Sequence, residues 1–282
     1  MTLRVAVAQL APGRDRSLNE ERTLALLQEA GEAGVSLLVL PELCTSPYQL
    51  GEEELAPWAT ALPDGGVVQA WRRACQRLGI TLVAGLLERE REAYFNTSLL
   101  LDPQGRVARY RKAHLFGWER RRLTPGPALP QVWETPTARL ASLICYDLRF
   151  LEAVRLLALA GVQLLCVPTT WTDVGKPQPF DRYGLPAAAH LALGHAYANR
   201  IFVLCAGRVG QEKGVRYLGS SLIAGPSGQI LAGPGDGTSE ALLVADIQPA
   251  QADHKGIGPD NHVLADRRKD LYRLEAVRPD EG

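Results

Sequence analysis

The segment RLASLICYDLRFLEAVRLLALAGVQLLCVP, residues 139–168, combines three local patterns. Residues 139–144 and 163–167 are short apolar runs typical of buried strands, and residues 151–160 between them favour a helix. Two parallel strands of one sheet need a long crossover between them, and this crossover is usually helical. The segment therefore predicts a strand–helix–strand unit and indicates the α/β class.

The same alternation of short apolar runs and amphipathic stretches continues along the rest of the chain. The turn sequence 102–105 predicts a β-hairpin. Because no repeat, linker or composition break occurs, we expect one domain over residues 1–282, with the polar residues 251–282 forming a C-terminal arm at a subunit interface. Further helices are predicted at 18–31, 67–78 and 186–200, strands at 3–9, 36–40, 80–87, 94–101, 106–110, 201–206, 218–224, 229–232 and 241–247, and loops at 114–130 and 168–185.

The composition limits the possible partners and the location of the protein. The 31 basic and 31 acidic side chains cancel, so we expect neither a nucleic-acid nor a membrane partner. Residues 1–10 do not resemble a secretory leader, and the longest apolar stretch, 156–168, is too short to cross a bilayer. Five scattered cysteines are typical of a reduced protein, and no cysteine or histidine spacing resembles a zinc site. We therefore expect a cytoplasmic protein without a metal.

Cys145 stands where a predicted strand ends and a predicted helix begins. At such a turn the following backbone N–H groups and the positive end of the helix point toward the group that the side chain would attack. The same position is expected to lower the pKa of the thiol. Cys145 is therefore a candidate nucleophile. The cysteines inside helix or strand patterns are interpreted as packing residues: Cys75, Cys166 and Cys205.

Two charged residues stand at the ends of other predicted strands. Glu42 follows the apolar run 37–41, where a carboxylate is costly unless it is paired or used. Lys112, one of few lysines in the chain, follows the strand predicted at 106–110. Since groups at the ends of strands can converge at one edge of a sheet, we expect both side chains to lie near Cys145.

Three segments resemble the signature motifs of the nitrilase superfamily, the carbon–nitrogen hydrolases. They are LPE at 40–42, RKAHLF at 111–116 and LICYDLRF at 143–150, and weaker similarity extends over nearly the whole chain. The resemblance implies a four-layer αββα sandwich that pairs as αββα:αββα in a homodimer or a larger homo-oligomer.

The resemblance also implies roles for individual residues. Cys145 would be the nucleophile, Glu42 the general base and later the acid, and Lys112 an oxyanion stabiliser together with the backbone N–H of Tyr146. Glu119 matches a second glutamate that supports this triad in many members. The expected activity is that of an amidase. It would use water to cleave a small linear amide or an N-carbamoyl amine through a thioester, releasing ammonia without any cofactor.

Alternatives remain open at this point. A nitrilase would use the same triad on a small nitrile, a non-catalytic homologue would be a binding or regulatory subunit, and a thiol redox sensor would need a resolving cysteine such as Cys44. An aromatic pocket without a basic anchor would favour a neutral or cationic substrate over a dicarboxylic amide. Candidate substrate-binding residues are Tyr48, Trp118, Trp171 and His195.

Overall fold

The computed structural model describes residues 1–174 and 179–277, and two β-sheets form its centre. In the first sheet β3 (Thr60–Ala61) pairs with β4, and the other strands follow the order β15 (Ala241–Ile247), β1 (Leu3–Gln9), β2 (Leu37–Val39), β4 (Thr81–Glu90), β5 (Ala93–Leu101), β6 (Val107–Arg111). The second sheet has the order β14 (Ile230–Ala232), β13 (Leu222–Ala224), β10 (Phe202–Ala206), β9 (Leu164–Pro168), β8 (Arg139–Ser142), β7 (Trp133–Glu134).

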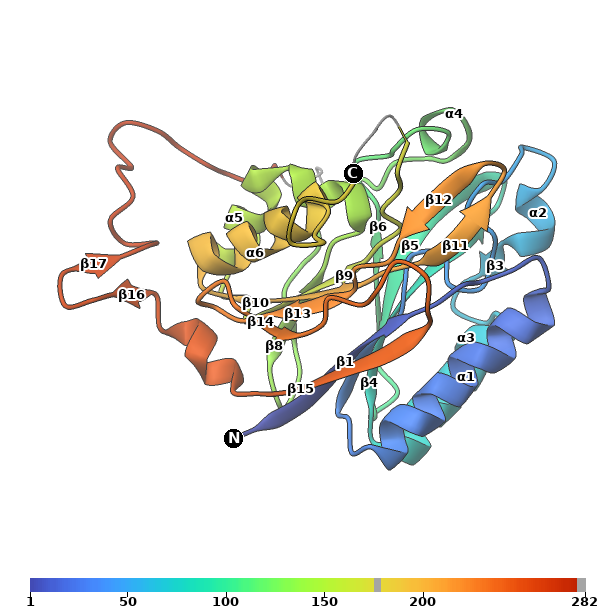
Figure 1. Cartoon of the computed structure of the whole chain (residues 1–282), viewed down its shortest axis with the longest axis horizontal. Helices are drawn as coiled ribbons and strands as arrows, with labels where there is room; N and C mark the ends of the chain where they lie inside the picture. Colours follow the sequence, from blue (N-terminus) through green and yellow to red (C-terminus); the bar gives the residue numbers. More distant parts are fainter. Residues whose placement is uncertain (175–178, 278–282) are drawn as a thin grey trace.

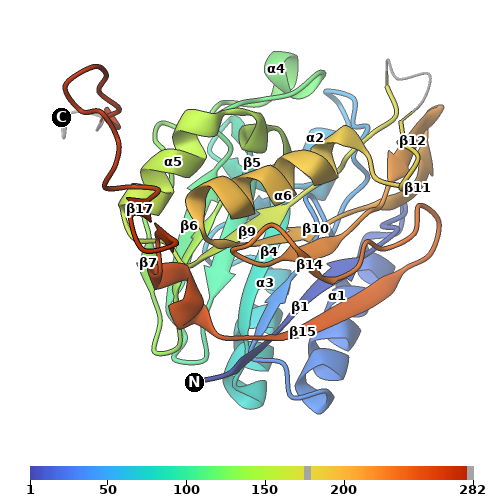
Figure 2. The same cartoon turned by 60° about the vertical axis from the view of Figure 1, so that its left-hand side comes forward.

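Helices cover the outer face of each sheet (Figures 1 and 2). α1 (Arg16–Glu32) and α3 (Gly66–Leu78) lie on the first sheet, and α5 (Leu151–Leu159) and α6 (Ala187–Asn199) lie on the second. One apolar core fills each helix–sheet interface and a third lies between the sheets. The layers therefore follow the order helix, sheet, sheet, helix, and the predicted αββα sandwich is confirmed.

Strand β1 shows how the sequence produces these layers. Val5 and Val7 point into the core between the two sheets, whereas Ala6 and Ala8 point into the core beneath α1 and α3. Successive side chains of a strand point to opposite faces, so a strand buried on both faces needs an unbroken apolar run. Burial on both faces therefore explains the apolar runs at the start of the chain and within residues 139–168.

The segments between the main layers contain elements that the sequence did not predict. The expected loop 114–130 includes the short helix α4 (Glu119–Arg122), and Cys145 begins a 3₁₀ helix, η1 (Cys145–Arg149). Of the expected loop 168–185, residues 175–178 lie outside the described residues. The other elements are α2 (Leu55–Trp58), the hairpin β11 (Val209–Glu212) and β12 (Val215–Leu218), and, near the C-terminus, η2 (Pro249–Asp253), β16 (Gly256–Ile257) and β17 (Asn261–His262).

The C-terminal residues run outside the four layers. After β15 the chain passes through η2, β16 and β17 and extends away from the sheets beside α5 (Figure 1). Most side chains from residue 256 to residue 277 are exposed, and residues 278–282 of the predicted arm lie outside the described residues. Among the helices of the described ranges, none is long and apolar enough to cross a membrane.

Asp15 is the N-cap of α1, and its Oδ1 accepts a hydrogen bond of 3.1 Å from the backbone N–H of Leu18. Asp15→Ala leaves this N–H without its partner, so we expect the free energy of unfolding to fall by about 1 kcal/mol. Urea denaturation followed by circular dichroism measures the change. Asp15→Ser keeps a capping oxygen and should retain most of the stability. An equal loss in both variants would contradict the capping role.

Candidate active site

The ammonium group of Lys112 lies between two carboxylates. Its Nζ is 2.7 Å from Glu42 Oε1, 2.8 Å from Glu119 Oε2 and 3.0 Å from Glu119 Oε1. All three side chains are fully buried. Charges in such surroundings are tolerated only when they are paired and hydrogen-bonded. The structure therefore brings together three of the residues that the sequence nominated.

Asn96 on β5 fixes the two carboxylates relative to each other. Its Nδ2 donates to Glu42 Oε1 over 2.8 Å and to Glu119 Oε1 over 2.7 Å. Phe116 adds a backbone N–H to Glu119 Oε2 at 2.7 Å. Oε1 of Glu42 is thus held by Asn96 and Lys112, while its Oε2 is buried without a hydrogen-bond partner among the described residues. One oxygen of the carboxylate anchors the side chain and the other is a free acceptor.

The backbone places Lys112 and Glu42 through close strand contacts. The N–H of Lys112 donates to the Asn96 carbonyl at 2.8 Å, and the Lys112 carbonyl accepts from Gly126 at 2.8 Å. Glu42 follows β2, and Gly85 of the neighbouring strand β4 lies directly against its backbone. A Cβ atom at residue 85 would be 2.6 Å from the Cα of Glu42. Glycine at this position therefore permits the approach that places the carboxylate.

Cys145 comes from the second sheet, at the turn between β8 and η1. Its φ of +46° lies in the left-handed region, which is strained for a residue with a side chain. Asp147 holds this turn, since its backbone N–H donates to the Ile144 carbonyl at 2.9 Å and its Oδ2 accepts from the Ile144 N–H at 3.0 Å. The partly exposed Cys145 lines a pocket of about 200 Å³.

Asp147 also ties this turn to the segment that carries Lys112. Its buried carboxylate accepts from the Tyr110 hydroxyl at 2.9 Å and from the His114 backbone N–H at 3.0 Å. Nδ1 of the His114 ring lies 2.8 Å from the same carboxylate. Asp147 lies within the LICYDLRF motif but had no assigned role, and Asn96 was not nominated from the sequence. For Asp147 the available signal was an acidic residue directly after a buried strand.

The charges of the site affect one another. Burial alone would lower the pKa of Lys112, but Glu119 and Glu42 outweigh it and hold that pKa above its ordinary value, so Lys112 stays protonated. Burial and the negative charge of Glu42 raise the pKa of the Cys145 thiol to about 12, although Lys112 opposes the shift. The expectation that the turn lowers this pKa is therefore wrong, because desolvation of the thiolate dominates. Burial and Glu42 also raise the pKa of Glu119.

The candidate substrate-binding residues divide into two groups. Trp171 lines the pocket beside Cys145, as does Tyr146, whose N–H the sequence assigned to the oxyanion. Tyr48 and Trp118 lie elsewhere, packed edge to face at 5.8 Å, with the Tyr48 hydroxyl 3.4 Å from Glu119 Oε1. Tyr48 therefore contacts the charged cluster through Glu119, and Trp118 packs against Tyr48. The remaining pocket residues are Phe116, Leu148, Arg149, Thr170, Thr172, Val174, Ala188 and Leu191.

His195 on α6 is buried, and its Nε2 lies 2.7 Å from the Leu148 carbonyl of η1. It supports the turn that carries Cys145 and is not among the residues that line the pocket. The assignment of His195, Tyr48 and Trp118 to substrate binding stays a prediction. Within the described ranges, no group of three or more His, Cys, Asp or Glu side chains is arranged to hold a metal ion.

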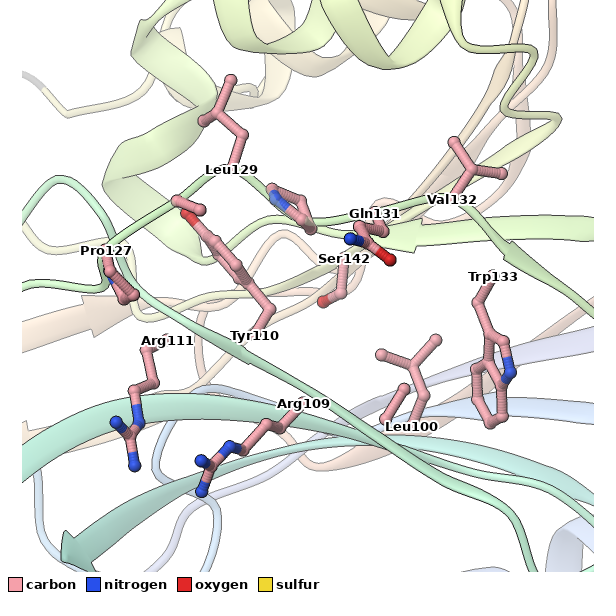
Figure 3. A pocket seen from close by; sticks show the side chains of 13 residues that line it. Leu100, Arg109, Tyr110, Arg111, Pro127, Leu129, Gln131, Val132, Trp133 and Ser142 are labelled. Carbon is pink, nitrogen blue, oxygen red and sulfur yellow. The ribbon is translucent and has the colours of Figure 1, made fainter. Parts of the chain in front are cut away.

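A second pocket, of about 360 Å³, lies between β6 and the segment 127–133 (Figure 3). Tyr110 extends toward Leu129 there, while Arg109 and Arg111 extend to the other side. Both arginines bind the buried carboxylate of Glu88, at 2.7 and 2.5 Å. None of the nominated catalytic residues lines this pocket, so we place the chemistry at Cys145.

Comparison with known proteins identifies the class to which this fold and this cluster belong. The family model described as carbon-nitrogen hydrolase matches residues 4–254, and the chain therefore belongs to the carbon–nitrogen hydrolase family. The resemblance read from the sequence motifs is confirmed.

Individual relatives match over nearly their full length. A nitrilase of Pyrococcus abyssi is 29% identical, covering 96% of this chain and 99% of the relative. The N-carbamoylputrescine amidase of Solanum lycopersicum is 30% identical over 96% of this chain and 93% of its own. The crystal structure of an amidase from Nesterenkonia sp. superimposes with a TM-score of 0.75 at 28% identity, covering 95% of this chain and 94% of that one.

The contact between Gly85 and Glu42 gives a test of how the site is placed. Gly85→Ala forces a Cβ atom against backbone that cannot move aside, so we expect a loss of about 1–3 kcal/mol in the free energy of unfolding and a loss of hydrolytic activity. Gly66→Ala, in α3, is the matched control because nothing lies within 4 Å of the added atom. It should leave stability unchanged or raise it. Similar behaviour of the two variants in urea denaturation would argue against the role of Gly85.

Proposed function

We propose that this protein is a cysteine amidase that hydrolyses a small linear amide or an N-carbamoyl amine and releases ammonia. The observation that carries the proposal is the free Oε2 of Glu42, in a buried ion cluster whose charges act on the Cys145 thiol. Family membership and the relatives named as amidases support the same reaction class.

The raised pKa of Cys145 determines the first step. At pH 7 a thiol with a pKa of about 12 is ionised in about one molecule in 100,000, so the proton must leave as the sulfur attacks the amide carbon. Glu42 accepts this proton on Oε2, because Oε1 is already held by Lys112 and Asn96. When ionised, the two glutamates and the lysine carry one net negative charge, which favours uptake of the proton.

Lys112 and Glu119 have supporting roles in the same cycle. Lys112 keeps its proton, so it acts as a fixed positive charge that stabilises the oxyanion, together with the N–H of Tyr146. Collapse of the tetrahedral intermediate breaks the carbon–nitrogen bond, and Glu42 protonates the departing ammonia. Glu42 then removes a proton from water, which attacks the thioester, yielding the acid and the free thiol. Glu119 holds Lys112 in place from its other side.

The same residues would serve a nitrilase, and the name of the Pyrococcus abyssi relative makes this the second candidate. Release of ammonia from a panel of amides, N-carbamoyl amines and nitriles separates the two. We expect turnover of amides or N-carbamoyl amines. Turnover confined to nitriles would contradict the proposal, and absence of any turnover would favour a binding or regulatory homologue.

Glu42→Gln should change two properties of the site in opposite directions. The variant loses the base, so kcat/KM should fall about 1,000-fold. It also loses a negative charge that raises the pKa of Cys145, so that pKa should fall and iodoacetamide should label the thiol faster at pH 8. Peptide mapping locates the label, and Cys145→Ala provides the unlabelled reference.

A matched control for this experiment is Glu20→Gln on α1, in a solvent-accessible ion pair with Arg16. It should change neither the labelling rate nor kcat/KM. Slower labelling of Cys145 in Glu42→Gln, or unchanged activity, would contradict the assigned role of Glu42.

We also propose that residues 1–282 form one domain that pairs as an αββα:αββα homodimer in the cytoplasm, with the arm 251–282 at the subunit interface. Support comes from apolar side chains that the described part of the arm leaves uncovered. Apolar side chains that one segment leaves exposed gain from burial against a partner. The exposed fractions are 44% for Ile257, 69% for Leu271, 52% for Tyr272 and 91% for Val277.

The homodimer predicts a molar mass in solution that is twice that of the chain, measured by light scattering after size exclusion. The double variant Leu271→Ser and Tyr272→Ser should lower this mass or raise the dissociation constant, because the interface loses apolar area. Leu18→Ser, at an exposed apolar position on α1, is the control and should leave the mass unchanged. A monomeric unmodified chain would contradict the proposal.

A further inference from the structure

Thr169 follows strand β9, next to the strand that leads to Cys145. β8 and β9 are parallel, with Ser142 opposite Cys166, so both strands end at the same edge of the second sheet. Cys145 comes shortly after β8, and Thr169 comes directly after β9. Groups that follow neighbouring parallel strands converge at such an edge. The sheet therefore places the side chain of Thr169 at the nucleophile.

Backbone hydrogen bonds fix this placement. The N–H of Thr169 donates to the Ala206 carbonyl at 2.8 Å, which ties the residue to the end of β10. The N–H of Leu143 donates to the Cys166 carbonyl at 3.1 Å, which ties the chain just before Cys145 to β9. The separation between the Thr169 side chain and the sulfur of Cys145 is thus set by the sheet.

The hydroxyl of Thr169 has no hydrogen-bond partner among the described residues, although the residue is fully buried. A buried hydroxyl without a partner is costly, and in a native structure it calls for an explanation. A hydroxyl rotates about its carbon–oxygen bond, so it can direct its proton toward a group that becomes an acceptor only during the reaction. Thr169 is placed to serve such a group.

The group beside this hydroxyl is the sulfur of Cys145. The hydroxyl of Thr169 and the backbone N–H of Thr170 both stabilise the thiolate and so lower the pKa of Cys145, although burial and Glu42 outweigh them. A neutral thiol is a weak acceptor, whereas a thiolate accepts strong, charge-assisted hydrogen bonds. The hydroxyl therefore gains a partner when negative charge develops on the sulfur.

We propose that Thr169 is a further catalytic residue, whose hydroxyl donates a hydrogen bond to the sulfur of Cys145 when that sulfur carries negative charge. The inference deepens the proposed amidase function, and its part in turnover rests on that function. It gives the sulfur a donor of its own, in addition to Lys112 and the N–H of Tyr146, which are assigned to the substrate oxygen.

The hydrogen bond matters most when the thioester breaks. Water attacks the thioester carbon and gives one proton to Glu42. The carbon–sulfur bond then breaks, and its electron pair leaves with the sulfur of Cys145 as a thiolate. The proton on Glu42 passes to this sulfur, while Thr169 keeps its own proton throughout. Because burial disfavours the thiolate, a donor aimed at the sulfur lowers the energy of this step.

Labelling of the substrate-free enzyme with iodoacetamide tests the contact. Thr169→Val has nearly the same shape but lacks the donor. Labelling of Cys145 at pH 8 should be about three- to tenfold slower, because one hydrogen bond to a charged group changes the thiolate population about tenfold and the more basic thiolate is somewhat more nucleophilic. Thr169→Ser keeps a hydroxyl and should be labelled at close to the unmodified rate. Peptide mapping assigns the label to Cys145.

Thr45→Val is the matched control, since the hydroxyl of Thr45 is also buried without a partner among the described residues. It should leave the labelling rate unchanged. All these variants retain the titratable and charged groups that face the sulfur or its pocket, which are Glu42, Tyr48, Lys112, Arg149 and Cys205. A slower rate that is confined to Thr169→Val therefore reports the lost hydroxyl.

Turnover provides a second measurement. For the amide that the substrate panel identifies as the best, Thr169→Val should lower kcat about tenfold and leave KM within about twofold, because the hydroxyl is directed at the sulfur and not at the bound amide. Thr169→Ser should recover most of kcat. A loss that appears in KM alone would contradict the catalytic role.

The outcomes separate this inference from the function on which it rests. Equal labelling rates for the unmodified enzyme and Thr169→Val would refute the contact and leave the amidase function standing. Slower labelling with recovery in Thr169→Ser would support the contact even if no amide were cleaved, a result that would overturn the amidase function alone. If Thr169→Val does not fold, Thr169→Ala also lacks the hydroxyl and should show the same slower labelling.

Discussion

The placement of the Lys112 ammonium between Glu42 and Glu119 is the constraint on which the site depends. Charges without access to water must be satisfied completely, and removing one partner of such a group typically costs about 3–5 kcal/mol. Asn96, Phe116 and the backbone around Lys112 supply the required hydrogen bonds. The strands β2, β5 and β6 must therefore be in register, because each contributes an atom to the cluster or leads directly into it. The same rigidity leaves one oxygen of Glu42 free for chemistry.

Much of the architecture could be predicted because burial on two faces leaves a clear record in the sequence. Strands β9 and β10 are apolar at every position, β1 has an unbroken apolar run over residues 5–8, and α3 has the apolar spacing of a helix packed on a sheet. Short elements such as α4 and the hairpin of β11 and β12 have no comparable apolar pattern in the sequence. Their conformations depend on contacts with distant residues, as Glu119 illustrates: its α4 turn is held by Lys112 and Asn96.

The catalytic side chains could be nominated from motifs, but their electrostatics could not be predicted. The turn at Cys145 suggested an acidic thiol, whereas the structure raises its pKa, because neither the burial of the sulfur nor the charge of Glu42 beside it can be read from local sequence. The contact of the Tyr48 ring with Trp118 and of its hydroxyl with Glu119 could not be predicted either, because the side from which an aromatic ring approaches is fixed by tertiary packing.

Asp147 connects the two sheets, and each sheet carries only part of the catalytic site. Glu42 and Lys112 belong to the first sheet and Cys145 to the second, and the Asp147 carboxylate joins the two through Tyr110 and His114. The reactive groups are therefore distributed over the two sheets, and the site is complete only when the sheets are docked. A folding intermediate with both sheets formed but not docked would retain its circular dichroism spectrum and have no catalytic activity. Turnover during refolding thus reports when the two sheets dock.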